Sequence, residues 1–238
     1  LLIYNGGEME GWVEQVIEAS DNKAMLADGM MNHVEIYEEE IVEGMEEEEH
    51  GHEGEKEYDE HIWTSPVNAQ KLIQQIAKDL SKADPEHKEE YQQNADAYKK
   101  KLDELDKQFS DVVSRAETRY LVFGDQFPLR YFVEEYDLEY SAAFAGCSAD
   151  TEPSTDTIAY LTNQVKDKKI PVVLKIELTS PKVAQIIAES TGAEVETFYT
   201  CHNVTKEQFG QGVTYLSLMQ ENVKVLTEAL GVTVEKAK

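Results

Sequence analysis

A long stretch of the chain, Pro85–Arg115, contains no glycine and no proline after its first residue. Its apolar residues recur at steps of four and three positions: Tyr91, Ala95, Tyr98, Leu102, Leu105, Phe109 and Val112. This spacing predicts one long amphipathic helix. A coiled coil has similar spacing, but the stretch covers only about four heptads and the flanking sequence follows other patterns. We therefore interpret it as a rigid helix that packs along two lobes and joins them.

Beyond Glu117 the pattern changes to strands that alternate with helices. We expect strands at Tyr120–Phe123, Tyr140–Phe144, Val172–Ile176 and Val195–Tyr199, and helices at Phe127–Tyr136, Thr155–Lys166, Pro181–Ser190 and Val213–Leu230. Such alternation is typical of a parallel sheet wrapped by helices. Ligands bind outside the carboxyl ends of strands in these sheets, so we expect a binding rim there. The rim comprises Gly124–Gln126, Phe144–Cys147, Glu177 and Tyr199–His202.

The part of the chain before the long helix is less regular. Leu1–Tyr4 indicates a strand that ends at a turn, and residues 8–20 have helical spacing. Ser65 and Pro66 together are typical of a helix start. Because the chain opens within a strand, we expect this lobe to lack its opening elements. The predicted fold is α/β, with two lobes of parallel-sheet cores wrapped by helices: an N-terminal lobe (1–84), a joining helix (85–116) and a C-terminal lobe (117–238).

The residues between 43 and 60 are dominated by glutamate, and two histidines, His50 and His52, lie among them. Like charges repel and few apolar residues are available to bury, so this segment should be a mobile surface loop. The two histidines either collect zinc weakly and pass it on, or are incidental members of a solvated charge run.

The composition excludes several classes of function. The chain has 238 residues and a formal net charge of −26. This charge argues against binding to nucleic acid, whose phosphates must be met by lysine and arginine, and against docking onto anionic lipid. No apolar run is long enough to span a membrane. The two cysteines, Cys147 and Cys201, form a single disulfide, lie as buried neighbours or ligate a metal.

One local motif carries chemistry: Asp59-Glu60-His61-Ile62-Trp63-Thr64-Ser65-Pro66. A histidine just before a helix start has a constrained backbone, which suits a metal ligand. Imidazole binds borderline metals such as zinc, and carboxylates suit zinc or manganese. On spacing alone, His61 is equally compatible with a structural role in a local turn.

The motif resembles the D-x-H-x-W-x-S-P signature of the metal-binding lipoproteins of bacterial zinc and manganese ABC importers. The resemblance runs through most of the chain, and Cys201-His202-Asn203-Val204 points to a variant branch. The matching segments are Leu1–Gly7, the acidic histidine-containing loop, the helix from Pro85, Phe127–Leu138, Glu152-Pro153-Ser154, Ser180–Val183 and Thr191-Gly192-Ala193.

The resemblance implies a metal, Zn²⁺ or alternatively Mn²⁺, held between two lobes by four ligands. Of these, only His61 carries over. The first ligand would precede Leu1, the third aligns with Gly124, and the fourth aligns near Tyr199. The substitutes on the same rim are Asp125, His202 and Cys201, with Tyr199, Glu177 and Cys147 as weaker candidates.

The candidates have plain alternatives. Asp125 either ligates a metal or caps the next helix. His202 either lines the cleft or satisfies a buried backbone group. Trp63 is expected in the core, and His33 and His87 on the surface without supporting partners.

Three classes of function remain. The first is an extracytoplasmic solute-binding protein that captures zinc and delivers it to the membrane permease of an ABC importer. Such a binding protein would be held at the membrane only by an N-terminal lipid anchor. The second is a surface adhesin on the same fold, with reduced or lost metal binding. The third, a metallohydrolase, is disfavoured because no H-E-x-x-H or comparable metal-plus-base motif occurs.

Overall fold

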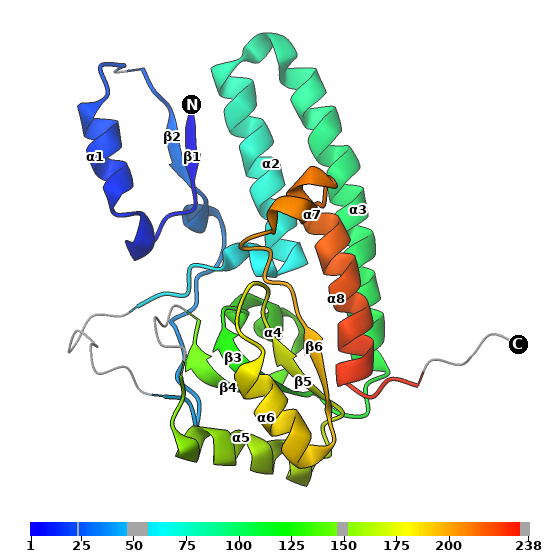
Figure 1. Ribbon diagram of the computed structural model, residues 1–238. Coiled ribbons are helices and arrows are strands. Elements are labelled where there is room, and N and C mark those ends of the chain that lie inside the picture. The colour runs from blue at the N-terminus through cyan, green and yellow to red at the C-terminus, as the bar shows by residue number, and fades with distance from the viewer. Residues whose placement is uncertain (23, 47–56, 147–151, 234–238) are drawn as a thin grey trace, which may run out of the picture.

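The computed structural model describes residues 1–22, 24–46, 57–146 and 152–233. Its longest element, helix α3 (Lys88–Ser114), follows a short 3-10 turn at Pro85–His87 and confirms the predicted long helix. Helix α3 packs against α2 (Pro66–Ala83) in an antiparallel hairpin and against α8 (Tyr215–Ala229) near its other end (Figure 1). The lobe boundaries at 84 and 116 stay a prediction. Among the described residues, no helix is both long and apolar enough to cross a membrane.

The C-terminal part contains a four-stranded parallel sheet with the strand order β4-β3-β5-β6. The strands are β3 (Tyr120–Phe127), β4 (Glu139–Ala145), β5 (Val172–Lys175) and β6 (Glu194–Thr197). Helices α5 (Thr155–Lys168) and α6 (Lys182–Thr191) cover one face, and α4 (Arg130–Tyr136), α3 and α8 cover the other (Figure 1). The predicted α/β class, with parallel sheets wrapped by helices, is confirmed.

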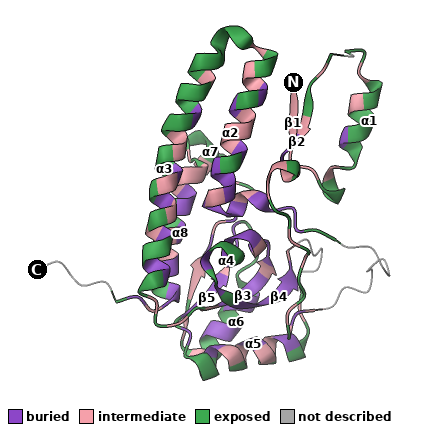
Figure 2. Cartoon of the chain, turned by 180° about the vertical axis from the view of Figure 1, so that it is seen from behind, coloured by how far each residue is buried: buried purple, intermediate pink, exposed green. Residues whose placement is uncertain are grey.

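Side-chain alternation along β3 divides the hydrophobic core between the two faces of this sheet. Leu121 and Phe123 join the large core beneath α3, α4 and α8, whereas Val122 between them joins the core beneath α5 and α6. Burial is greatest in β3, β4 and β5, whereas the edge strand β6 has no buried residue (Figure 2). Strand β3 continues to Phe127, where we expected a helix to begin, and the short helix α7 (Lys206–Gly210) was not predicted.

The N-terminal part contains a second, smaller sheet. Strands β1 (Leu2–Tyr4) and β2 (Ala27–Gly29) pair in parallel, and a 3-10 turn (Glu8–Glu10) and helix α1 (Trp12–Ala19) connect them. A small core of Met30, Ile62, Leu72 and Tyr131 lies next to this sheet. Since Tyr131 belongs to α4, this core also joins the N-terminal part to the C-terminal part.

The first residues of the acidic segment 43–60 are anchored, contrary to the predicted mobile loop. The side chain of Met45 is buried in the large core, and the backbone N–H of Glu46 donates to the carbonyl of Ala143. The carboxylate of Glu46 accepts the backbone N–H of Ser154 at the start of α5. A hydrogen bond from the Thr157 side chain, with those from Ser154, lowers the pKa of Glu46 despite its partial burial. The rest of the loop, including His50 and His52, lies outside the described residues.

Candidate metal centre

His61 lies in a buried segment, Asp59–Ser65, which we call the His61 strap. The side chain of Asn5, directly after β1, donates to the carbonyl of Glu60 at 2.8 Å. From the other side, the Tyr131 hydroxyl donates to the carbonyl of Asp59 at 2.6 Å. Ser65 accepts the backbone N–H of Asn68 and so caps α2, as predicted. Elements from both halves of the chain therefore hold the strap.

The ring of His61 is oriented by a neighbouring carboxylate. One oxygen of Asp59, Oδ1, lies 3.0 Å from Nδ1 of His61 and also accepts the His61 backbone N–H at 2.8 Å. Both residues are almost completely buried, at 3% and 2% exposure for His61 and Asp59. Within the described part of the chain, no hydrogen bond reaches Nε2 of His61. A proton on Nδ1 that points at Asp59 leaves the Nε2 lone pair free for a ligand.

A second histidine faces His61 across the boundary between the strap and the loop after β6. The ring centroids of His61 and His202 lie 5.8 Å apart in an edge-on arrangement. Trp63 lies against both, at 5.5 Å from His61 and 5.8 Å from His202. Trp63 is partly buried and packs against the small core of Met30, Ile62, Leu72 and Tyr131, so it lies at the edge of the core in which we predicted it. Its indole N–H donates to the carbonyl of Thr200 at 2.9 Å, which connects the strap to the loop.

The structure assigns Asp125 and Glu177 to hydrogen bonds within the C-terminal part. Asp125 accepts the backbone N–H groups of Gln126 and Ile176 and the hydroxyl of Thr179, so it stabilises the turn after β5 and does not cap a helix. Glu177, in that turn, accepts hydrogen bonds from the loop that carries His202. Both carboxylates are buried.

Cys201 does not face the histidine pair. Its thiol is free, is packed against the large core, and has its pKa raised far above the usual value by burial and by the nearby Glu177 charge. A protonated, core-facing thiol is a poor metal ligand. The backbone of Tyr199 is held by the side-chain amide of Asn222. The amide oxygen accepts the Tyr199 N–H at 2.7 Å, and the amide NH₂ donates to the Tyr199 carbonyl at 2.7 Å. The free Cys201 thiol makes the alternative of a Cys147–Cys201 disulfide wrong. Cys147 itself lies outside the described residues, so its ligand role stays a prediction.

Gly124 explains why no third ligand extends from β3. A Cβ atom at this position would lie 2.7 Å from both the Cα and the backbone nitrogen of Ala184, in the first turns of α6. Any side chain there would collide with helix backbone. The space beside Gly124, where the resemblance would place a third ligand, is therefore filled by the packing of α6 on the sheet.

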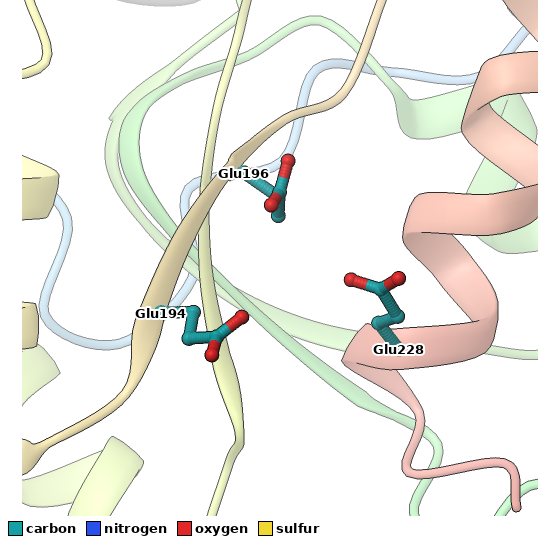
Figure 3. A group of neighbouring side chains, drawn as sticks. All are labelled: Glu194, Glu196 and Glu228. Carbon is teal, nitrogen blue, oxygen red and sulfur yellow. The ribbon is translucent and has the colours of Figure 1, made fainter.

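A separate group of three carboxylates lies on β6 and α8: Glu194, Glu196 and Glu228 (Figure 3). Among the described residues, this is the only group of three or more histidine, cysteine or acidic side chains whose ligand atoms lie within 4.8 Å of one another. Accordingly, no third such side chain in the described ranges completes a cluster with His61 and His202. We refer to the three carboxylates as the glutamate triad.

Two other histidines have partners that the sequence did not indicate. His33 lies 2.8 Å from a carboxylate oxygen of Asp28, and His87 lies 2.8 Å from Asp84. The expectation that they stand without supporting partners is wrong. Both are more exposed than His61, and neither is in ring contact with another histidine among the described residues.

Comparison with known proteins supplies the family. The family model described as zinc-uptake complex component A, periplasmic (ZnuA) matches residues 1–229. The chain belongs to the ZnuA family. Its fold is thus that of a ZnuA-family protein, as the resemblance implied.

Individual relatives of this ZnuA-family chain agree in both sequence and structure. It is 33% identical to the zinc-binding lipoprotein AdcA of Streptococcus pneumoniae R6 over 99% of this chain, which spans only 47% of AdcA, about half its length. It is 32% identical to the high-affinity zinc uptake system protein ZnuA of Bacillus subtilis, covering 97% of this chain and 72% of that protein. The crystal structure of the metal-dependent lipoprotein YcdH from Bacillus subtilis superposes with a TM-score of 0.78 at 29% identity, over 97% of this chain and 80% of that one.

Proposed function

We propose that the protein is an extracytoplasmic solute-binding protein that captures zinc and delivers it to the membrane permease of an ABC importer. The observation that carries the proposal is the Asp59–His61–His202 arrangement. One histidine is held by a carboxylate with Nε2 free, and a second histidine ring meets it from the other half of the chain. Two imidazole nitrogens favour zinc over manganese, which prefers oxygen ligands. We expect the remaining ligands from solvent or from outside the described residues.

Delivery to a permease is supported by membership of a family described as a component of a zinc-uptake complex. The extracytoplasmic location is supported by relatives named as lipoproteins. The continuous helix α3 contacts both α2 and α8, so large hinge motions are disfavoured and small movements of the ligand-bearing loop are the expected route of release. In this proposal the protein binds and hands over its metal and carries out no reaction.

The test is a competitive chelator titration of the protein with zinc, and separately with manganese. His61→Ala and His202→Ala should each weaken zinc binding strongly, since each removes a ligand. His87→Ala is the matched control, because His87 also pairs with an aspartate but lies on the exposed surface at the start of α3. Equal affinities in all four proteins would overturn the proposal.

The same measurements separate the alternatives. A protein that binds neither metal would favour the adhesin alternative, in which the fold persists without metal capture. Turnover of generic ester or phosphate substrates by the zinc-loaded protein would favour a metallohydrolase. Manganese binding tighter than zinc binding would reject the choice of metal but keep the site.

A further inference from the structure

We propose that Glu177 is a positioning residue for the metal centre, which acts by holding the Thr200–His202 turn so that the ring of His202 meets His61. This inference rests on the proposed function, since it concerns the same centre. It assigns Glu177 a role distinct from that of a ligand, and it makes Thr200 the link between the two sides of the centre.

The contacts of Glu177 are directed at one turn. Its Oε2 accepts the backbone N–H of Thr200 at 2.8 Å, and its Oε1 accepts the Thr200 hydroxyl at 2.8 Å and the backbone N–H of His202 at 3.1 Å. Glu177 is 9% exposed and Thr200 only 1% exposed. A buried carboxylate needs donors such as these, and three of them converge on it from the segment that carries His202.

The turn needs this support because its backbone is strained. Cys201, between the two residues that Glu177 binds, has φ of 60°, and Leu178, next to Glu177 itself, also has φ of 60°. Residues with a Cβ occupy this left-handed region at an energetic cost, so surrounding contacts must maintain it. The left-handed residue lets the N–H groups of Thr200 and His202 converge on one carboxylate. With this backbone conformation, the side chain of Cys201 packs against the core while the neighbouring His202 is exposed.

Thr200 is held from the opposite side by the His61 strap. Its carbonyl accepts the indole N–H of Trp63, and Trp63 contacts the rings of both histidines. All the polar groups of Thr200 are therefore in use: its N–H and hydroxyl toward Glu177, and its carbonyl toward Trp63. A displacement of the turn would break these bonds and move His202 relative to His61 at the same time.

A direct ligand role for Glu177 fits the contacts less well. Three donors already occupy its two oxygens, and metal coordination would require breaking bonds to a buried turn. An acceptor that orients a ligand-bearing segment is a recognised way in which outer residues tune metal affinity.

The main experiment replaces Glu177 with glutamine and measures zinc affinity. Glu177→Gln keeps the side-chain shape but presents an NH₂ group where a carboxylate oxygen accepted N–H donors. We expect zinc binding to weaken about 10- to 100-fold. The control is Asp106→Asn, because Asp106 also accepts a buried partner's hydrogen bond, from Tyr136, but lies on α3. It should leave zinc affinity within about twofold of wild type.

A double-mutant cycle distinguishes positioning from general destabilisation. If Glu177 acts through His202, Glu177→Gln should have little further effect on zinc affinity in the His202→Ala background. A merely structural residue would lower the melting temperature and leave affinity unchanged, or would add its effect independently. Equal effects of Glu177→Gln in the two backgrounds would overturn the inference.

Two further measurements keep the test decisive. In metal-free protein, Glu177→Gln should shift the ring resonances of His202 in a histidine NMR spectrum and leave those of His87 in place; an unmoved His202 would overturn the inference. If Glu177→Gln does not fold, Thr200→Val is the alternative. It removes the hydroxyl that donates to Glu177 and accepts the His202 backbone N–H at 3.3 Å, and it should weaken zinc binding by about tenfold or less. Loss of binding in His61→Ala with wild-type affinity in both Glu177→Gln and Thr200→Val would keep the proposed function and reject the role of Glu177.

Discussion

The histidine pair and the glutamate triad both bring metal-binding groups together, but they are built differently. One ring nitrogen of His61 is hydrogen-bonded to Asp59, and the turn that carries His202 is held by Glu177 and Trp63. The triad carboxylates make no side-chain hydrogen bond or ion pair with the described residues, and Glu194 and Glu228 are exposed. The difference teaches that proximity alone does not define a site: the groups must also be oriented by partners that hold them in place.

The largest expected effect separates the two regions directly. His61→Ala removes a ligand and should raise the dissociation constant for zinc by more than about 100-fold, beyond the effect expected of an outer residue. Glu228→Gln should change it by less than about twofold, because the triad is not a zinc site in our interpretation. Competitive titration measures both. The comparison fails if the triad variant loses more affinity than the histidine variant.

The second effect tests whether orientation matters as well as the ligand. Asp59→Asn should weaken zinc binding about 10- to 100-fold, since an amide oxygen holds the Nδ1 proton less strongly than a carboxylate does. Asp28→Asn is the matched control: Asp28 pairs with His33 through a similar 2.8 Å contact, outside the centre. Similar losses in the two variants would show that His–Asp pairing in general, rather than this pair, supports binding.

The third prediction compares Glu46, whose carboxylate accepts hydrogen bonds, with the carboxylates of the glutamate triad, which face one another. Glu46 is hydrogen-bonded in the folded protein and its pKa lies below 4.5, its ordinary value. Its contribution to stability is therefore present above about pH 4.5 and is lost as the pH falls through the lowered pKa. Glu46→Gln should lower the melting temperature by about 1 to 3 °C at pH 7. Melting curves at pH 7 and pH 3 should show that this difference shrinks in acid; a constant difference would contradict the argument.

The smallest effect belongs to the triad itself. Glu194→Gln should raise the melting temperature at pH 7 by about 1 °C or less, because it relieves repulsion between like charges that lack partners. Calorimetry in low salt is the measurement. The control is Glu189→Gln, which changes an exposed glutamate on α6 that makes no side-chain hydrogen bond or ion pair with the described residues. A clear fall in melting temperature would indicate that the triad has a stabilising partner, such as a bound cation.

The parts of the fold that follow from periodicity were predictable from the sequence. The long helix, the four strands after Glu117 and the Ser65 cap rest on local spacing and on capping chemistry, which act within a few residues. The same local patterns could not reveal that β3 continues to Phe127. Neither could they show that Met45 is buried, since its partners come from distant segments.

The candidate site was predictable only in part. The motif around His61 and the position of His202 after a strand pointed to the two histidines that the structure brings together. The direction in which a side chain leaves the turn is set by one left-handed residue, so sequence could not tell that Cys201 packs inward while His202 is exposed. Thr200 falls within the predicted rim, but no pattern indicated its role, because its importance comes from contacts with Glu177 and Trp63 rather than from its chemistry.

Gly124 packs closely against Ala184, so a larger residue at position 124 is tolerated only if the backbone around position 184 also moves. A histidine introduced at position 124 would meet the backbone of α6 before it reached a metal, so a single substitution cannot rebuild a ligand there. The helix would first have to move away from the sheet, which would open the core around Val122 and Ile187 and cost stability. A route through such an intermediate is uphill at its first step, so a side-chain ligand at this point of β3 is difficult to acquire by single substitutions.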